Sequence, residues 1–159
     1  MELKLFPHHT GVWEGTYKRL AANGSVMFEH SSRLTLRLDG NKWYQTNYYT
    51  FENGREEFHN FGEAIFNEKG IMVFDNPRIY GEAWEGDRNI MLNWTYKDQP
   101  GSQLYEMITS LGDGHRMRVW QFSQNGVFQG LMMIEERKVA DQDTISMSHY
   151  EQKSYVKAA

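Results

Sequence analysis

The chain has no cysteine among its 159 residues, which excludes disulfide bonds and thiol chemistry. It has only 3 prolines and no low-complexity tract, so an ordered domain is expected. No stretch approaches the roughly 18 apolar residues of a membrane span, and the first ten residues do not resemble a signal peptide. We therefore expect one domain, residues 1–159, located in the cytoplasm.

The sequence also lacks an excess of positive charge. Its 17 basic and 21 acidic residues give a formal net charge of -4 and interleave along the chain. The chain has no excess of basic residues to neutralise a phosphate backbone, so we expect no nucleic-acid partner and no membrane partner. Glycine-flanked serine elbows, phosphate-binding loops and dinucleotide fingerprints are absent as well. The remaining partner class is a small molecule, and a homodimer is left open.

Aromatic residues, by contrast, are abundant. They make up 14% of the chain, with 5 Trp, 9 Tyr and 9 Phe, and 9 Met accompany them. Large rings with polar edges suit a ligand cavity lined by aromatic side chains. They also suit β-sheets in general, so the composition alone supports both interpretations.

Turn signals divide the chain into short segments that alternate polar and apolar residues. Asparagine or aspartate followed by glycine is typical of hairpin turns, and it occurs at Asn23-Gly24, Asp39-Gly40, Asn53-Gly54, Asp113-Gly114 and Asn125-Gly126. The expected strands are 11–21, 25–38, 42–52, 55–66, 71–75, 79–85, 89–97, 103–111, 115–123 and 127–139, with a last one over 144–151. Helical periodicity is confined to one turn at the N-terminus. The pattern predicts an all-β fold: a single antiparallel up-and-down β-barrel of about 8–10 strands, closed to remove its edges.

Gly11-Val12-Trp13 at the first strand resembles the glycine-any-tryptophan signature of lipocalins and their calycin relatives. In that superfamily the tryptophan plugs the closed barrel end beneath an arginine of the last strand, which implies this role for Arg137. The chain also resembles a bacterial lipocalin-like family of unknown function. The segments that carry this resemblance are 11–16, 45–49, 105–108, 116–120 and 135–137. The resemblance implies a barrel and supplies no reaction.

Three titratable side chains are candidates for acid–base chemistry inside the barrel: Glu106, Arg118 and His59. With two-residue turns at Asp113-Gly114 and Asn125-Gly126, Glu106 lies on the face opposite the arginines. A bulge shifting the pairing by one residue would bring it to their face. The same turns pair Arg116 with Glu135 and leave Arg118 without a carboxylate, available to a polar ligand group. The alternatives are an internal salt bridge or arginines that face water.

The candidate ligand-binding residues are amides, a phenol and indoles: Gln45, Asn47, Tyr49, Trp84, Trp94 and Trp120. Amides and phenols between large rings are the groups that orient a ligand in an apolar pocket. The sequence does not determine which face of residues 42–52 is interior, and the resemblance favours Gln45, Asn47 and Tyr49 facing inward.

Six histidines are present, and none has the spacing of a zinc site, so no metal and no cofactor are expected. Haem is a minor possibility, because some calycin relatives hold it through one barrel histidine. The positions to check are His59, which the Asn53-Gly54 turn pairs with Tyr48, and His149.

These observations favour a carrier or binding protein for a small apolar or aromatic molecule. The alternative is a cofactor-free isomerase, cyclase or lyase that acts on a small metabolite by acid–base catalysis in the barrel, so enzymatic activity is left open. A protein-interaction module is a third possibility.

Overall fold

The computed structural model describes residues 1–159 and is built from strands joined by short turns. The strands are β1 (Gly11–Leu20), β2 (Val26–Asp39), β3 (Lys42–Phe51), β4 (Glu56–Phe66), β5 (Met72–Asp75), β6 (Ile79–Glu85), β7 (Asn89–Tyr96), β8 (Ser102–Gly112), β9 (His115–Gln124), β10 (Val127–Ala140) and β11 (Tyr155–Lys157). The ten strands expected up to residue 139 are all present, within one or two residues of their expected limits.

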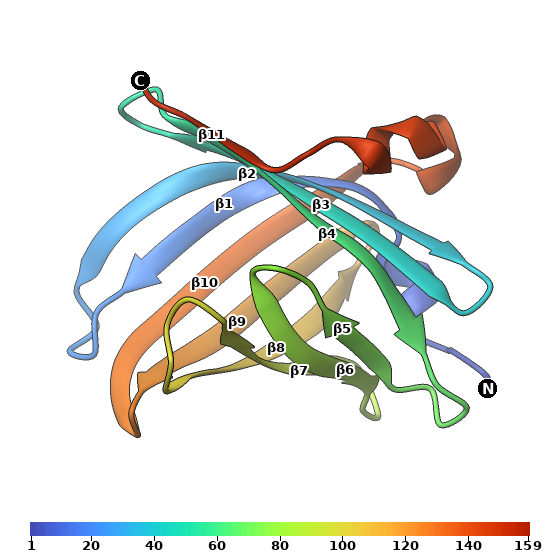
Figure 1. Ribbon diagram of the computed structural model, residues 1–159, viewed down its shortest axis with the longest axis horizontal. Coiled ribbons are helices and arrows are strands. Elements are labelled where there is room, and N and C mark those ends of the chain that lie inside the picture. Colours follow the sequence, from blue (N-terminus) through green and yellow to red (C-terminus); the bar gives the residue numbers. More distant parts are fainter.

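The sheet closes on itself as an antiparallel up-and-down barrel (Figure 1). Each strand from β1 to β10 pairs with its neighbours in the sequence. Pairing of β1 with β10 and of β4 with β5 closes the ring. The β4–β5 contact is limited to Ile65 with Val73 and Phe66 with Met72. The all-β barrel expected from the turn pattern is therefore confirmed, with ten strands.

Two hairpins show how the turns form and why the pairing beyond them shifts. Asp113 and Asn125 adopt positive φ angles of 49° and 51°, as a two-residue turn of this kind requires. Register shifts follow, between Ser110 and Gly112 in β8 and between Phe128 and Gly130 in β10. Each bulge displaces the pairing by one residue, which reverses the face on which the residues beyond it meet.

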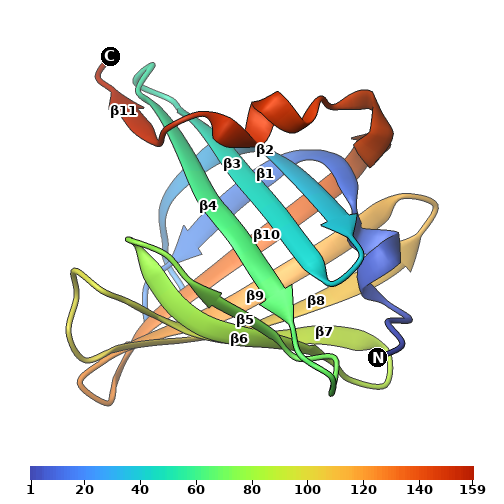
Figure 2. The same cartoon turned by 45° about the vertical axis from the view of Figure 1, so that its right-hand side comes forward.

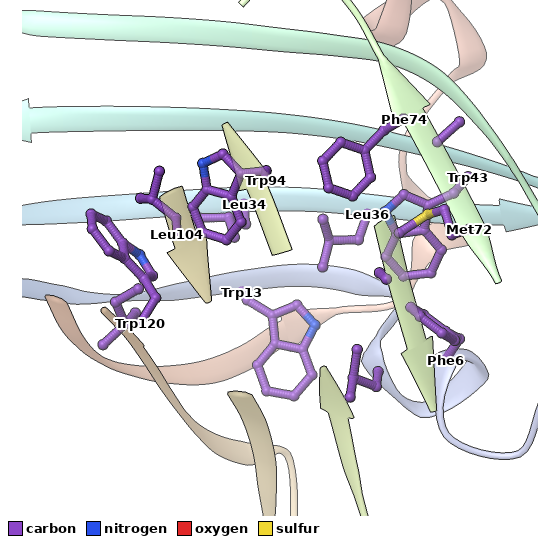
Figure 3. Close-up of a cluster of buried hydrophobic side chains, with 14 of the residues drawn as sticks. Phe6, Trp13, Leu34, Leu36, Trp43, Met72, Phe74, Trp94, Leu104 and Trp120 are labelled. Atoms are coloured by element: carbon purple, nitrogen blue, oxygen red, sulfur yellow. The ribbon is translucent and has the colours of Figure 1, made fainter. Parts of the chain in front are cut away.

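The N-terminal segment closes one end of the barrel. The 3₁₀ helix η1 (Phe6–His9) is the single N-terminal turn expected from the sequence. Phe6 packs edge-on against Trp43 and Phe66, with ring centres 5.5 and 4.8 Å apart. The backbone N–H groups of residues 4–6 donate to the carboxylate of Glu85 and fix the segment. Figure 3 shows Phe6 and Trp43 at one side of the core and Trp94 and Trp120 at the other.

The strand expected over residues 144–151 is wrong. Residues there form two short 3₁₀ helices, η2 (Gln142–Thr144) and η3 (Met147–Glu151), which lie outside the barrel (Figure 2). Ser146 begins η3, and its side chain accepts a hydrogen bond from the Ser148 N–H. Tyr150 is buried against Tyr44 and packs η3 on the outside of β3. The chain then adds β11 to the edge of β4.

The helical segments of the structure are all short, and none has the length and apolar character needed to span a membrane.

Candidate ligand-binding site

Arg118 on β9 lies at the centre of a buried charge cluster inside the barrel. Its Nε donates to Glu106 Oε2 at 2.7 Å, and Nη2 donates to Oε1 at 3.3 Å. Its Nη1 donates to the Tyr17 hydroxyl at 2.9 Å and to Glu136 at 3.3 Å. Burial opposes the charge, but the carboxylate of Glu106 and the neighbouring oxygens raise the pKa of Arg118 well above its ordinary value. The guanidinium is therefore fixed as a cation.

Arg116 is the second cation of this cluster and lies nearer the closed end. Its Nε donates to Glu136 Oε1 at 2.9 Å, and its Nη1 donates to His9 Nδ1 at 3.2 Å. Its guanidinium carbon lies 4.1 Å from the centre of the Trp13 ring. Burial alone would raise the pKa of Glu136, but the two arginines outweigh it and hold that pKa below its ordinary value. Two buried cations thus face two buried carboxylates.

The bulges correct the pairing expected from simple turns. Because of the shift in β8, Glu106 lies opposite Trp120 and faces the arginines. Because of the shift in β10, Arg116 lies opposite Glu136, so its expected pairing with Glu135 is wrong. The expectation that Arg118 lacks a carboxylate is also wrong, since it contacts two. Two of the alternatives left open by the sequence are therefore observed: the pairing of β8 with β9 is shifted by one residue, and the arginines form internal salt bridges.

The arginine over Trp13 was also assigned incorrectly from the sequence. Arg137 is exposed on the outer face of β10, whereas Arg116 of β9 covers the indole. The indole N–H of Trp13 donates to the carbonyl oxygens of His9 and Thr10. The closed end is therefore a stack of buried groups from the N-terminal segment, β1 and β9.

Next to this cluster lies a cavity of about 110 Å³ inside the barrel. Its aromatic wall is formed by Tyr17, Trp43, Tyr49, Phe61, Phe74, Trp94, Tyr96 and Trp120. The side chains of Glu106 and Arg118 form a polar part of the wall. Trp94 and Trp120 meet edge to face, with ring centres 5.8 Å apart. The interior thus combines a mostly aromatic surface with a few polar groups, as ligand cavities do.

The inward face of β3 adds a row of polar side chains to the cavity wall. The Trp43 indole donates to Gln45 Oε1 at 3.2 Å, and Gln45 Nε2 donates to Asn47 Oδ1 at 3.0 Å. Asn47 Nδ2 in turn donates to the Tyr49 hydroxyl at 2.8 Å. Gln45, Asn47 and Tyr49 therefore all face inward and line the cavity. Each amide donates only one of its two N–H groups within this row.

His59 does not join Glu106 and Arg118. The β3–β4 loop is one residue longer than expected, so His59 lies opposite Asn47 and not opposite Tyr48. Its Nε2 contacts Glu57 Oε1 at 2.9 Å, and its Nδ1 contacts Arg78 Nη1 at 3.3 Å. The structure thus brings together two of the three expected acid–base residues and places the third at the rim of the barrel.

Of the expected binding tryptophans, Trp94 and Trp120 line the cavity and Trp84 does not. Trp84 alternates with the inward residue Ala83 and lies in register with Met91 on the outer face. The cavity is also lined by four residues that were not expected from the sequence: Tyr17, Trp43, Tyr96 and Arg78. The alternation of side chains along β3 was the signal that could have identified Trp43, because Trp43 lies on the same face of this strand as Gln45.

The histidines considered for haem have both ring nitrogens engaged. His59 contacts Glu57 and Arg78, and His149 Nε2 contacts Thr46 Oγ1 at 2.7 Å while its Nδ1 contacts Gln152. His149 lies on η3, outside the barrel. These residues do not fit an axial haem ligand, which needs one nitrogen free and directed into the cavity. The structure also has no group of three or more His, Asp or Glu side chains placed to hold a metal ion.

The fold and the site define an antiparallel β-barrel with an internal, largely aromatic cavity. Residues 2–141 match the family described as "Domain of unknown function (DUF3598), N-terminal", and the chain belongs to this family. No curated protein matches the sequence.

Two solved structures have a similar fold. One is a protein of unknown function of the DUF3598 family from Nostoc punctiforme, with 15% identity and a TM-score of 0.65 over 87% of this chain. This chain spans about half of that protein, 51% of its length. The other is Rv2717c from M. tuberculosis, with 15% identity and a TM-score of 0.58, covering 85% of this chain and 94% of the other. At this identity the likeness concerns the fold.

Proposed function

We propose that the protein binds a small apolar or aromatic molecule inside the barrel, as a carrier or binding protein. The observation that carries this proposal is the cavity itself, with aromatic side chains on most of its wall. Burying a ring against these residues removes apolar surface from water, at about 25 cal/mol per Å². Edge and face contacts with the tryptophans add to this term.

The volume of the cavity limits the size of the ligand. An engineered protein cavity of about 150 Å³ lined by apolar side chains holds benzene. The cavity here is about 110 Å³, smaller than that example, so its volume limits the enclosed group to at most about one ring. A larger ligand needs space outside the barrel or movement of side chains. We therefore favour a ligand whose enclosed part is a single ring or a short branched chain.

Gln45 and Asn47 supply the polar groups that would orient this ligand. Each amide lines the cavity and retains one N–H beyond its hydrogen bond within the β3 row. Such a donor stabilises an acceptor on the ligand by about 0.5–1.5 kcal/mol. By contrast, the hydrogen-bonding groups of Arg118 are directed at Glu106, Glu136 and Tyr17, so this residue shapes the wall.

A titration with single-ring compounds tests the proposal. We expect toluene and phenol to shift the indole N–H resonances of Trp43, Trp94 and Trp120, which line the cavity, and to leave that of Trp84 unchanged. Absence of any shift up to the solubility limit of both compounds would refute binding inside the barrel. Equal shifts at Trp84 would indicate a surface site instead.

A second candidate is a cofactor-free isomerase, cyclase or lyase. The observation that favours it is the carboxylate of Glu106, which lines an apolar cavity beside a fixed cation. Such a pair could move a proton next to a carbonyl group and stabilise the enolate. To test this, we would measure the exchange of the α-protons of phenylacetone with deuterated solvent. The protein should accelerate this exchange, and Glu106→Gln should abolish the acceleration. A rate equal to that in buffer would exclude this chemistry for the probe.

We also propose that the barrel is a member of the calycin superfamily. Support comes from Gly11-Val12-Trp13 at the start of β1 and from the arginine that covers the Trp13 ring. In this chain that arginine is Arg116, from the strand before the last one of the barrel.

A further inference from the structure

The wall of the barrel is incomplete on one side of β4. This strand pairs with β11 at Glu56–Phe58 and with β5 at Ile65–Phe66. Between these contacts, residues 59–64 have no strand partner on that edge, and in Figure 2 the β5–β6 hairpin diverges from β4 there. The cavity reaches this side of the barrel, since Phe61 and Gly62 of β4 and Asn76 and Arg78 of the β5–β6 turn are part of its lining.

A polar groove of about 590 Å³ continues outward from this opening. It shares four lining residues with the cavity: Phe61, Gly62, Asn76 and Arg78. The rest of its lining comes from residues beside them on β4 and in the β5–β6 turn, from the turn after β7 and from the segment that precedes β11. A molecule with one end in the cavity can therefore extend its other end into a polar environment without crossing the barrel wall.

Arg78 is the cation located at this junction. No carboxylate lies within 4.0 Å of its guanidinium, whereas Arg116 and Arg118 each contact one or two. Its Cζ lies 5.5 Å from the centre of the Tyr96 ring, which lines the cavity. The turn that carries it is fixed, because Asn76 accepts from the Arg78 N–H and donates to the Phe61 carbonyl at 3.2 Å. The guanidinium is thus available and held at the mouth of the cavity.

His59 supports Arg78 without neutralising it. Its Nδ1 accepts from Arg78 Nη1 at 3.3 Å, so its proton lies on Nε2 and is donated to Glu57 Oε1. Burial and the nearby Arg78 lower the pKa of His59, which keeps the ring uncharged near neutral pH. The carboxylate of Glu57 is paired with Arg55 at 2.7 Å. One positive charge therefore remains at the mouth without an opposing carboxylate in contact.

We propose that the ligand is an amphipathic carboxylate, with its ring in the cavity and its carboxylate hydrogen-bonded to Arg78 at the mouth. This inference rests on the proposed function and names the class of ligand. A guanidinium matches a carboxylate in charge and in bidentate geometry. Lys153 and Asp98 also line the groove with opposite charges, so Arg78 supplies the uncompensated one.

Hydrocinnamate and its amide, hydrocinnamamide, form a matched pair of probes, since both place one ring two carbons from the head group. We expect the carboxylate to bind the wild-type protein about tenfold more tightly than the amide, as for a charge-assisted hydrogen bond. Calorimetric titration measures both affinities. Because the mouth is exposed to solvent, the preference should shrink at about 1 M salt.

Arg78→Gln should remove the preference for the carboxylate and leave the amide affinity unchanged. Arg88→Gln is the matched control, because Arg88 is an exposed arginine in the β6–β7 turn and lies outside the lining of the groove. Equal affinities of the two probes for the wild type, or a preference that survives Arg78→Gln, would overturn the carboxylate assignment while the binding proposal stands. If neither probe binds, both proposals fail.

Discussion

The guanidinium carbon of Arg116 lies 4.1 Å from the centre of the Trp13 indole ring, where the N-terminal segment closes the barrel. The cation is held in this position by Glu136 and by His9, and the indole N–H is held by two backbone carbonyls. In a desolvated setting this contact contributes about 2 kcal/mol. These contacts fasten the closed end, whereas the cavity lining extends to the opening between β4 and the β5–β6 turn.

Glu136→Gln should strongly destabilise the fold. The substitution leaves the buried cations Arg116 and Arg118 with only Glu106 as a carboxylate partner. Breaking such a buried pair costs about 3–5 kcal/mol. The free energy of unfolding, measured by urea denaturation, should fall by this amount.

The adjacent Glu135 provides the control, because it is exposed and pairs with His115 at the surface. Glu135→Gln should change the free energy of unfolding by less than about 1 kcal/mol. Similar losses in the two variants would contradict the assignment of Glu136 as the carboxylate of the buried cluster.

Stability should decrease on mild acidification because of His9. Burial, and then the charge of Arg116, lower the pKa of His9 from 6.5 to about 3. The unfolded chain therefore binds a proton below pH 6.5 that the folded protein does not accept until about pH 3, so the stability falls as pH decreases through this window. Between about pH 6.5 and pH 5 the expected loss from this residue is roughly 1.5 kcal/mol.

His9→Asn isolates this contribution, because the amide oxygen replaces the Nδ1 acceptor for Arg116 without titrating. His30, His59 and His149 also have lowered pKa values, caused first by burial, and they act equally in both proteins. The variant should lose less stability than the wild type between about pH 7 and pH 5. Parallel pH profiles would count against a neutral His9 in the fold.

Filling the cavity should abolish ligand binding while the fold remains. Ala64 lines the cavity from β4, and Ala64→Leu adds three carbon atoms to a space of about 110 Å³. We expect the affinity for toluene and phenol to fall at least about tenfold, since the ring and the new side chain compete for one volume. The outward neighbour Ile65 is the control, and Ile65→Leu should bind as the wild type does. Unchanged binding in Ala64→Leu would place the ligand elsewhere.

Gly130 should be required at the bulge that sets the pairing of β9 with β10. Its φ is +120°, and a Cβ atom there would lie 2.0 Å from the Leu20 carbonyl oxygen. Gly130→Ala should therefore cost more than about 2 kcal/mol, as strain and steric overlap combine. At Gly40, also at positive φ but with open space around it, Gly40→Ala should cost about 1 kcal/mol. Equal costs in thermal unfolding would show that the bulge tolerates a side chain.

The strands and turns follow from short-range chemistry and were predictable from the sequence. Asp113-Gly114 and Asn125-Gly126 form two-residue turns because these residues tolerate positive φ angles, and alternation specifies the segments between them. The exception is the region after residue 140, where Ile145 and Met147 alternate as in a strand but Tyr150 packs a 3₁₀ helix against the outside of the barrel. In a segment this short, contacts with the barrel outweigh the local pattern.

The site depends on the tertiary structure for a different reason. One extra residue in β8 and another in β10 move Glu106 and Glu136 to the face of the arginines, and turn residues alone do not reveal such bulges. The sequence by itself determined the barrel and placed Gln45, Asn47 and Tyr49 on one face of β3, but the tertiary structure decided that this face is interior. Only the closed barrel decided that Arg116 covers Trp13, that Arg118 is paired with two carboxylates and that Arg78 lies at the mouth without one. These arrangements bring together side chains from different strands, and their geometry is set by strand register and by closure of the barrel.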